Sequence, residues 1–379
     1  MLFLAIFASQ AGVLVLSPIL SDVAAEFGVS VAAAGQLRIL AAPLAAVVAI
    51  AAGRALVRFS PRALLAAGSA FLAAGSVASA AAPTFALLAL AQVPVWTGVA
   101  ILMTAGVAAT AAWSAPEDRT KIVARALAGA PAAWIVGMPM IGLVAEVDWR
   151  LAFLALPLPA AAVAAAAVAR RPPDVPIPGA RTSLVRVLSQ RDARGWAVGE
   201  FFATSAWAGT LVFSGALFTE MHGTSPAATG LALALVAAAY LAGNQWAGRS
   251  DSGRARRTML TGTTAAAGAV ALTWAIAPTV VVTLVLFSVA AFVVATRTVA
   301  ATVYGFSVAG GHGREVGTIR AATSDMAYLV GSMVGGLALA VGGFPALAVA
   351  FGGLFVAATL PYVRVRGSRR GRPALQPAS

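Results

Sequence analysis

The sequence predicts an all-α integral membrane protein with about twelve transmembrane helices in two pseudo-symmetric six-helix bundles. Of its 379 residues, 60% are hydrophobic and only 10% are charged, and the mean hydropathy is +0.89. A water-soluble domain of this length needs more charged residues to cover its surface. Two further observations give the number and the grouping of the helices: apolar spans of helical length, and an internal repeat.

Each apolar segment is close to the roughly 20 residues that a helix needs to cross a bilayer. The first begins at Leu2 without a basic start, and no cleavage site of small residues precedes Asp22, so we expect a retained helix rather than a signal peptide. The expected spans are about 2–20, 31–53, 63–82, 84–113, 122–145, 151–169, 196–218, 226–247, 258–276, 279–305, 317–341 and 344–362.

Nearly all basic residues fall on one side of the predicted membrane. Of the 26 Lys and Arg residues, 23 lie in alternate loops, the central segment and the C-terminal tail, whereas the opposite loops are acidic and contain Arg150. By the positive-inside rule, both termini are cytoplasmic. The net charge of +13 thus reflects topology and contacts with membrane lipids, and it requires no nucleic acid. The excess of Ala and Arg is typical of a GC-rich bacterium, so we expect the bacterial inner membrane.

Three separated markers recur in the chain at offsets of 195, 195 and 194 residues. A constant offset indicates two halves with the same orientation in the membrane. The markers are Ala82-Pro83-Thr84 with Ala277-Pro278-Thr279, Gly53–Arg62 with Gly248–Arg257, and Gly137–Gly142 with Gly331–Gly336. The expected division is an N-terminal bundle at 1–169, a cytoplasmic linker at 170–194, a C-terminal bundle at 195–363 and a basic tail at 364–379.

Several classes of chemistry are not indicated. The sequence contains no cysteine and two histidines, His222 and His312, both in predicted loops, so we expect no metal site. Lys121 is the single lysine and no phosphate-binding loop surrounds it, so neither ATP hydrolysis nor another enzymatic activity is expected. No cofactor is expected, and one chain is expected to suffice as a monomer.

Four stretches carry a family resemblance. The loop after the second span has Gly53, Arg58 and Arg62, with Val57 where the family has an Asp, and its copy has Asp251 and Arg256. The fifth span has Gly129, Gly137, Pro139 and Gly142, and the sixth begins with Trp149-Arg150 followed by Phe153. At these residues the chain resembles the major facilitator superfamily, specifically its twelve-helix drug–proton antiporter branch. The resemblance implies alternating access and export of a small compound in exchange for protons.

Arg58 and Arg62 are open to two interpretations. They can belong to a cytoplasmic latch between the halves, or they can simply set topology, since Val57 cannot accept a charge. The Gly129, Ala133 and Gly137 face is predicted to be a sliding contact between the halves. Its expected partner on the eighth span is the similar stripe of Ala239, Gly243 and Ala247.

Ionisable residues at membrane depth are candidates for function because they are costly there. We expect Asp325 to bind the coupled proton and to pair with Arg297, and a static ion pair is the alternative. Glu200 is expected to reach the cytoplasmic interface, or else to be a second proton carrier. Arg38 is expected to reach outward to Asp22 or Glu26, or else to attract an anionic substrate group.

The substrate pocket is expected near mid-membrane, between the halves. Aromatic side chains with few hydrogen-bonding groups favour amphipathic or lipophilic molecules. The primary hypothesis is proton-coupled export of such a compound, and the alternative is uptake of a small metabolite by the same fold. Besides Arg38, the candidate substrate-binding residues are Gln10, Gln92, Trp96, Trp134, Trp207, Tyr240, Asn244 and Tyr328.

Overall fold

Every described element of secondary structure in a computed structural model of the chain is a helix. The structure describes residues 1–56, 58–113, 126, 128–170, 184–247, 254–309 and 313–363. Asp251 lies outside these ranges, and the side chains of Arg38 and Asp325 lie outside the described part as well.

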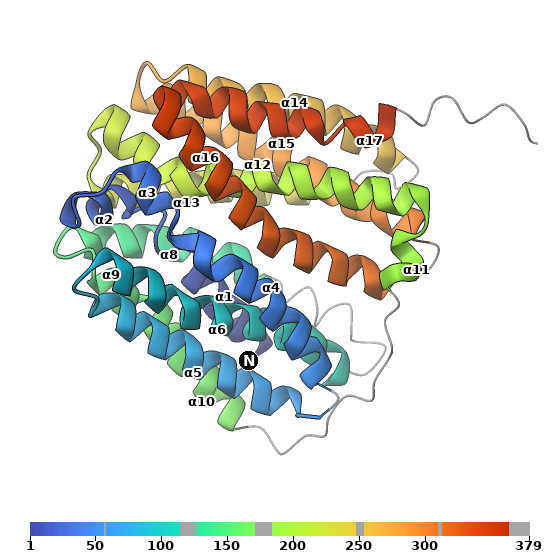
Figure 1. Cartoon of the computed structure of the whole chain (residues 1–379), viewed down its shortest axis with the longest axis horizontal. Helices are drawn as coiled ribbons and strands as arrows, with labels where there is room; N and C mark the ends of the chain where they lie inside the picture. The colour runs from blue at the N-terminus through green and yellow to red at the C-terminus, as the bar shows by residue number, and fades with distance from the viewer. Residues whose placement is uncertain are drawn as a thin grey trace, which may run out of the picture.

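The helices before residue 170, here called the N-terminal group, pack on one another and are drawn in blue to green in Figure 1. They are α1 (Leu2–Leu14), α2 (Leu20–Glu26), α3 (Val31–Gly35), α4 (Leu37–Ala55), α5 (Pro61–Ala80), α6 (Phe85–Ala112), α8 (Gly129–Ala145), α9 (Leu151–Ala155) and α10 (Pro157–Ala169). Within this group α5 lies along α6, and α1 contacts α6, α8 and α10.

The helices after residue 183 form the C-terminal group, which runs from light green to red in Figure 1. They are α11 (Leu184–Leu188), α12 (Arg191–His222), α13 (Pro226–Ala247), α14 (Ala255–Ala275), α15 (Val280–Val308), α16 (Gly313–Ala357) and α17 (Leu360–Val363). In this group α12 packs along α16, and α14 contacts both α15 and α16.

The repeated Ala-Pro-Thr marker has the same structural role in both groups. The Thr84 hydroxyl accepts the backbone N–H of Leu87 at 3.3 Å and caps the start of α6. The Thr279 hydroxyl accepts the N–H of Val282 at 3.3 Å and caps the start of α15. Such caps satisfy backbone donors that a helix leaves free at its first turn. The sequence repeat therefore corresponds to a repeated helix start.

Two predicted spans are interrupted near a proline, and one predicted gap appears as a reversal within a helix. The first ends at Leu14 instead of Leu20, since Pro18 has no N–H to continue the helical ladder. The sixth breaks between α9 and α10 at Pro157 for the same reason. The predicted gap between the last two spans is a reversal inside α16, where Gly343 has φ +65°, and Figure 1 shows the helix turning back there.

Seven of the described helices are long and apolar enough to cross a membrane, judged by length and composition. Three shorter apolar helices, Leu2–Leu14, Pro43–Ala55 and Gly129–Ala145, accompany them. The predicted class, an all-helical membrane protein, is confirmed.

The two groups meet mainly through α8 with α13 and through α3 and α4 with α16. On α13, a Cβ at Gly230 would clash with the Met138 carbonyl and lie 3.2 Å from Pro139 Cα, both on α8. The Gln36 amide donates to the Ser332 carbonyl at 2.8 Å, and Ser21 shares a 2.8 Å hydrogen bond with Thr219. In Figure 1 the groups meet around α2, α3 and α13 and diverge toward the opposite ends of α4 and α16.

The predicted sliding contact is wrong about which helix faces touch. A Cβ at Gly129 would meet the backbone of Phe3, and one at Gly137 would lie 2.6 Å from Leu156 Cδ2, so both glycines pack inside the N-terminal group. Gly243 faces Phe292 and Ala295 of its own group. Gly142 does reach the other group, because its Cβ would clash with the Pro226 carbonyl. Neighbouring helices lie on both sides of α8, and sequence spacing does not say which face meets which.

Candidate functional site

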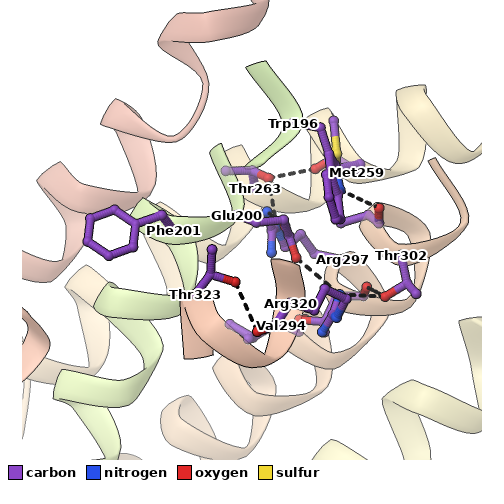
Figure 2. Close-up of polar contacts among 12 residues, drawn as sticks. Trp196, Glu200, Phe201, Met259, Thr263, Val294, Arg297, Thr302, Arg320 and Thr323 are labelled. Atoms are coloured by element: carbon purple, nitrogen blue, oxygen red, sulfur yellow. Dashed lines mark hydrogen bonds and ion pairs between the residues drawn. The ribbon is translucent and has the colours of Figure 1, made fainter. Parts of the chain in front are cut away.

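A buried carboxylate shared by two guanidinium groups lies inside the C-terminal group. Glu200 on α12 forms ion pairs with Arg297 on α15 and with Arg320 on α16, and the Arg320 Nη1–Glu200 Oε2 distance is 3.1 Å. The exposed fraction of the side chain is 2% for Glu200 and 3% for Arg297, whereas it is 27% for Arg320. Figure 2 shows Glu200 with both arginines. Each of the three residues comes from a different helix.

Hydroxyl groups hold the two arginines in place. Arg297 Nε donates to Thr263 Oγ1 at 3.2 Å, and Arg320 Nη1 donates to Thr302 Oγ1 at 2.5 Å. Gly262 leaves room for Arg297, since a Cβ there would lie 2.9 Å from Arg297 Cβ. These contacts fix the geometry of the ion pairs, which a buried charge requires.

The charged cluster sits well inside the helices that carry it. Glu200 follows Arg191, the first residue of α12, by nine residues, and Arg320 follows Gly313, the first residue of α16, by seven. At about 1.5 Å per residue these positions are roughly 14 Å and 10 Å from the helix ends. Glu200 and Arg297 are ionisable groups buried among apolar helices, which is costly, and they are therefore functional candidates.

This geometry corrects the expectation for Glu200 and gives Arg297 a partner that was not predicted. Glu200 does not reach an aqueous interface; it is buried and paired, and the pairing accounts for its tolerance of burial. Arg297 has Glu200 as its ion-pair partner, where the sequence suggested Asp325. A contact from the Asp325 side chain falls outside the described part and stays a prediction.

Four of the five predicted aromatic residues form two pairs. The Trp207 ring stacks on Tyr240 with centroids 5.9 Å apart and an interplanar angle of 15°, inside the C-terminal group. Trp96 of α6 lies 5.7 Å from Tyr328 of α16, so this pair joins the two groups. Aromatic faces of this kind suit an apolar or amphipathic ligand.

The remaining predicted pocket residues differ in accessibility. Trp134 Nε1 donates to Gln10 Oε1 at 3.2 Å between α8 and α1, and Asn244 is half-buried. Gln92 was a predicted pocket residue, but it is fully buried and donates to Ser79 Oγ at 3.0 Å. Its amide joins α6 to α5 and has no exposed surface for a ligand. The side chain of Arg38 lies outside the described part.

The loop arginines lie apart from this site. Arg62 Nη2 donates to the Ala169 carbonyl at 3.1 Å, within the N-terminal group, while Gly53 and Arg58 are exposed. Arg256 hydrogen-bonds to Tyr304 within the C-terminal group. The described hydrogen bonds of Arg62 and Arg256 lie within their own groups, and the latch stays a prediction.

Sequence reasoning missed Arg320, Thr263 and Thr302. Arg320 was counted with the loop charges that set topology, although it lies two turns inside its helix. Its depth, once the helix start is known, is the signal that identifies it. The hydroxyl of a threonine in an apolar helix usually bonds its own backbone, so Thr263 and Thr302 gave no such signal. Within the described ranges no three His, Cys, Asp or Glu residues gather as metal ligands.

Comparison with known proteins identifies the fold. The sequence profile of the Major Facilitator Superfamily matches residues 2–219, which is more than half of the chain. No curated protein matches the chain by sequence.

Solved structures that are similar to the chain include the following three. A bacterial homolog of the human lysosomal transporter Spinster, inward-facing and unoccupied, has a TM-score of 0.75 at 16% identity, covering 96% of this chain and 93% of that chain. Its inward-facing, occupied form has a TM-score of 0.73 at 15% identity with the same coverage. A D-xylose–proton symporter has a TM-score of 0.71 at 14% identity, covering 95% of each chain. These likenesses concern the fold, and with the profile match they establish that the chain is a secondary transporter, not an enzyme, of the Major Facilitator Superfamily.

Proposed function

We propose that this protein is a proton-coupled transporter in which Glu200 binds the proton. The observation that carries the proposal is its carboxylate, 2% exposed and shared between two guanidinium groups inside the C-terminal group. A proton on Glu200 removes one negative charge and weakens both ion pairs. Because α12, α15 and α16 each contribute one of the three charges, protonation changes the attraction between helices, which is what coupling to a conformational change requires.

The proposed architecture is two six-helix bundles with twelve crossings. The seven long spans, the three shorter apolar helices, α14 and the second arm of α16 after its reversal make up that number. The bundles are assigned to 1–169 and 195–363, joined by 170–194 and followed by the tail at 364–379. Both termini face the cytoplasm of a bacterial inner membrane, as the positive-inside rule favours.

The conformation described here is proposed to face inward. The close contacts between the groups involve α2, α3 and the start of α13, which are at the predicted outer end. The ends of α4 and α16 that diverge in Figure 1 lie at the predicted cytoplasmic end. Rocking of one bundle against the other then exposes a central site to each side in turn.

The substrate is proposed to be a small amphipathic compound that uses the Trp207–Tyr240 and Trp96–Tyr328 rings. Export by proton antiport, the activity of the branch that the chain resembles, is the first candidate for direction. The second candidate is proton-coupled uptake. One observation favours uptake. In an antiporter for cations, one carboxylate binds the proton and the cationic substrate in turn, and Glu200 is poorly suited to this exchange because two arginines already neutralise it. Asp325 stays a candidate proton carrier, and a monomer is proposed as the working unit.

Proton flux in liposomes tests the role of Glu200. Purified protein is reconstituted with an internal pH dye, and a panel of amphipathic drugs and metabolites is added outside. An active compound is expected to change the internal pH with wild-type protein and not with Glu200→Gln. Asp325→Asn is measured in parallel, so that loss in this variant alone reassigns the proton to Asp325. Full proton flux in Glu200→Gln refutes the proposed role.

A further inference from the structure

The described charges around Glu200 have an excess of positive charge. Glu200 contributes one negative charge, while Arg297 and Arg320 contribute two positive charges. Among the described residues, the phenols of Tyr240 and Tyr362 also act on the cluster from adjacent helices, and both are neutral at ordinary pH. The described part of the cluster is therefore a monocation inside a membrane helix bundle, a charge that an anion would neutralise.

Arg320 is the member of the cluster that a ligand can reach. Its side chain is 27% exposed, against 3% for Arg297, and the described hydrogen bonds to Glu200 and Thr302 both use its Nη1. It lies on the arm of α16 that borders the N-terminal group, since Tyr328, two turns further along this arm, contacts Trp96. The helix arm that carries Arg320 therefore borders the interface between the two groups, where this fold has its substrate site.

An aromatic pair lies within electrostatic range of Arg320. Tyr240 is within that range, and its ring is stacked on Trp207. A ligand that places an anionic head on Arg320 would extend its apolar body toward this pair.

We propose that Arg320 binds the anionic head of the substrate, and that the substrate class is an amphipathic organic monoanion such as a lipophilic carboxylate. A guanidinium group presents a planar set of donors that matches a carboxylate. The proposal rests on the assignment of Glu200 as the proton-binding group, and it names the substrate class and the sign of the coupling.

The sign of the coupling follows from competition for Arg320. The Glu200 carboxylate and the substrate carboxylate are two negative charges on the same guanidinium group, so each weakens the attraction of the other. When Glu200 takes up a proton, the full charge of Arg320 acts on the anion. Proton and substrate therefore load together, and by reciprocity each increases the affinity for the other. Such loading favours transport of both in the same direction, which is the uptake alternative.

The test uses three fluorescent probes with one apolar body. 11-(Dansylamino)undecanoate carries a carboxylate, its primary amide is neutral, and its trimethylammonium counterpart is cationic. Binding to protein in phosphatidylcholine nanodiscs is followed by energy transfer from tryptophan at pH 6 and pH 8. The carboxylate is expected to bind wild-type protein about tenfold more tightly than the amide, the gain of roughly one charge-assisted hydrogen bond, and more tightly at pH 6 than at pH 8.

Variants separate the inference from the proposed function. Arg320→Gln is expected to bind carboxylate and amide equally, Arg320→Lys to keep part of the preference, and the surface variant Arg186→Gln to match wild type. Amide binding to Arg320→Gln shows that the apolar site persists. Glu200→Gln should bind the carboxylate at pH 8 as tightly as wild type does at pH 6.

Each remaining outcome contradicts a definite part of the reasoning. Equal binding of the carboxylate and the amide by wild-type protein, or an unchanged preference in Arg320→Gln, overturns the anion site. A pH dependence that survives in Glu200→Gln overturns Glu200 as the proton site and leaves the anion site standing. Displacement of the carboxylate probe by phosphatidylglycerol in the nanodisc assigns Arg320 to a lipid headgroup and overturns the substrate assignment.

Discussion

Gly230 on α13 is the position at which a single methyl group should separate the two helix groups. An added Cβ would clash with the Met138 carbonyl and lie 3.0 Å from its carbon and 3.2 Å from Pro139 Cα. All three atoms belong to the backbone of α8, so no side-chain rotation can relieve the contact. Gly230→Ala must therefore push α13 away from α8 in the conformation described here.

The size of the effect follows from the cost of overpacking. Adding a methylene-sized group to a closely packed contact costs about 1–3 kcal/mol. If that cost applies only to the conformation in which α8 and α13 touch, the population ratio shifts by about 5–150-fold toward the opposite conformation. Such a shift is large enough to change which conformation dominates.

Distance measurements between spin labels can detect this shift, because the sequence contains no cysteine and two labels can be placed uniquely. Cysteines at Val147 and Met221, 82% and 47% exposed, report on the outer ends of the two groups. Gly230→Ala should add or enlarge a long-distance population between these labels. Gly268→Ala is the control, since a Cβ there meets no atom within 4 Å. If Gly230→Ala and Gly268→Ala gave the same distance distribution, the close-contact reasoning would be refuted.

Three further predictions concern stability and pH. Gly137→Leu should lower the melting temperature, because its Cβ would lie 2.6 Å from Leu156 and 3.3 Å from Leu14 inside one group; a melt like that of wild type would argue against this packing. Arg297→Gln should cost about 3–5 kcal/mol of unfolding free energy in SDS titrations, since it removes one partner of a buried ion pair; a cost below about 1 kcal/mol would indicate that Arg320 alone suffices. Burial, together with nearby Glu220, raises the pKa of Asp22 at the contact between α2 and α12, so protonation stabilises the touching state. That stabilisation is present at low pH and lost as the pH rises through the raised pKa, and the Val147–Met221 label distance should lengthen accordingly in wild type but not in Asp22→Asn.

Much of the fold could be predicted because it depends on local properties. Residues 61–80, 85–112 and 226–247 form helices within a few residues of the predicted spans, since apolar runs of bilayer length must pair their backbone groups internally. The capping threonines at the repeated Ala-Pro-Thr marker belong to the same local class. Pro18 and Pro157 interrupt two spans, an outcome that proline chemistry permits but does not require.

The candidate site could be predicted only in part. Glu200 and Arg297 were identified as ionisable residues at membrane depth, but their pairing was not, because the two are 97 residues apart and any of several helices can stand beside α12. Arg320 was counted among the loop charges that set topology, because its distance from the helix end depends on where α16 begins. Gln92 has the composition of a pocket residue, and only packing against Ser79 removes it from the pocket.

The row of small residues on α8 shows most clearly what the sequence determines and what only the tertiary structure decides. By itself the sequence determined that Gly129, Gly137 and Gly142 let other backbones come close, since the absence of a side chain is a property of each residue. Only the tertiary structure decided that the first two face their own group while Gly142 faces α13. A helix has neighbours on several sides, and the choice among them depends on the summed packing of all helices, which no local pattern contains. The same reasoning holds for Glu200: the sequence placed it within a membrane helix, but its burial and its partners were set by the arrangement of α12, α15 and α16.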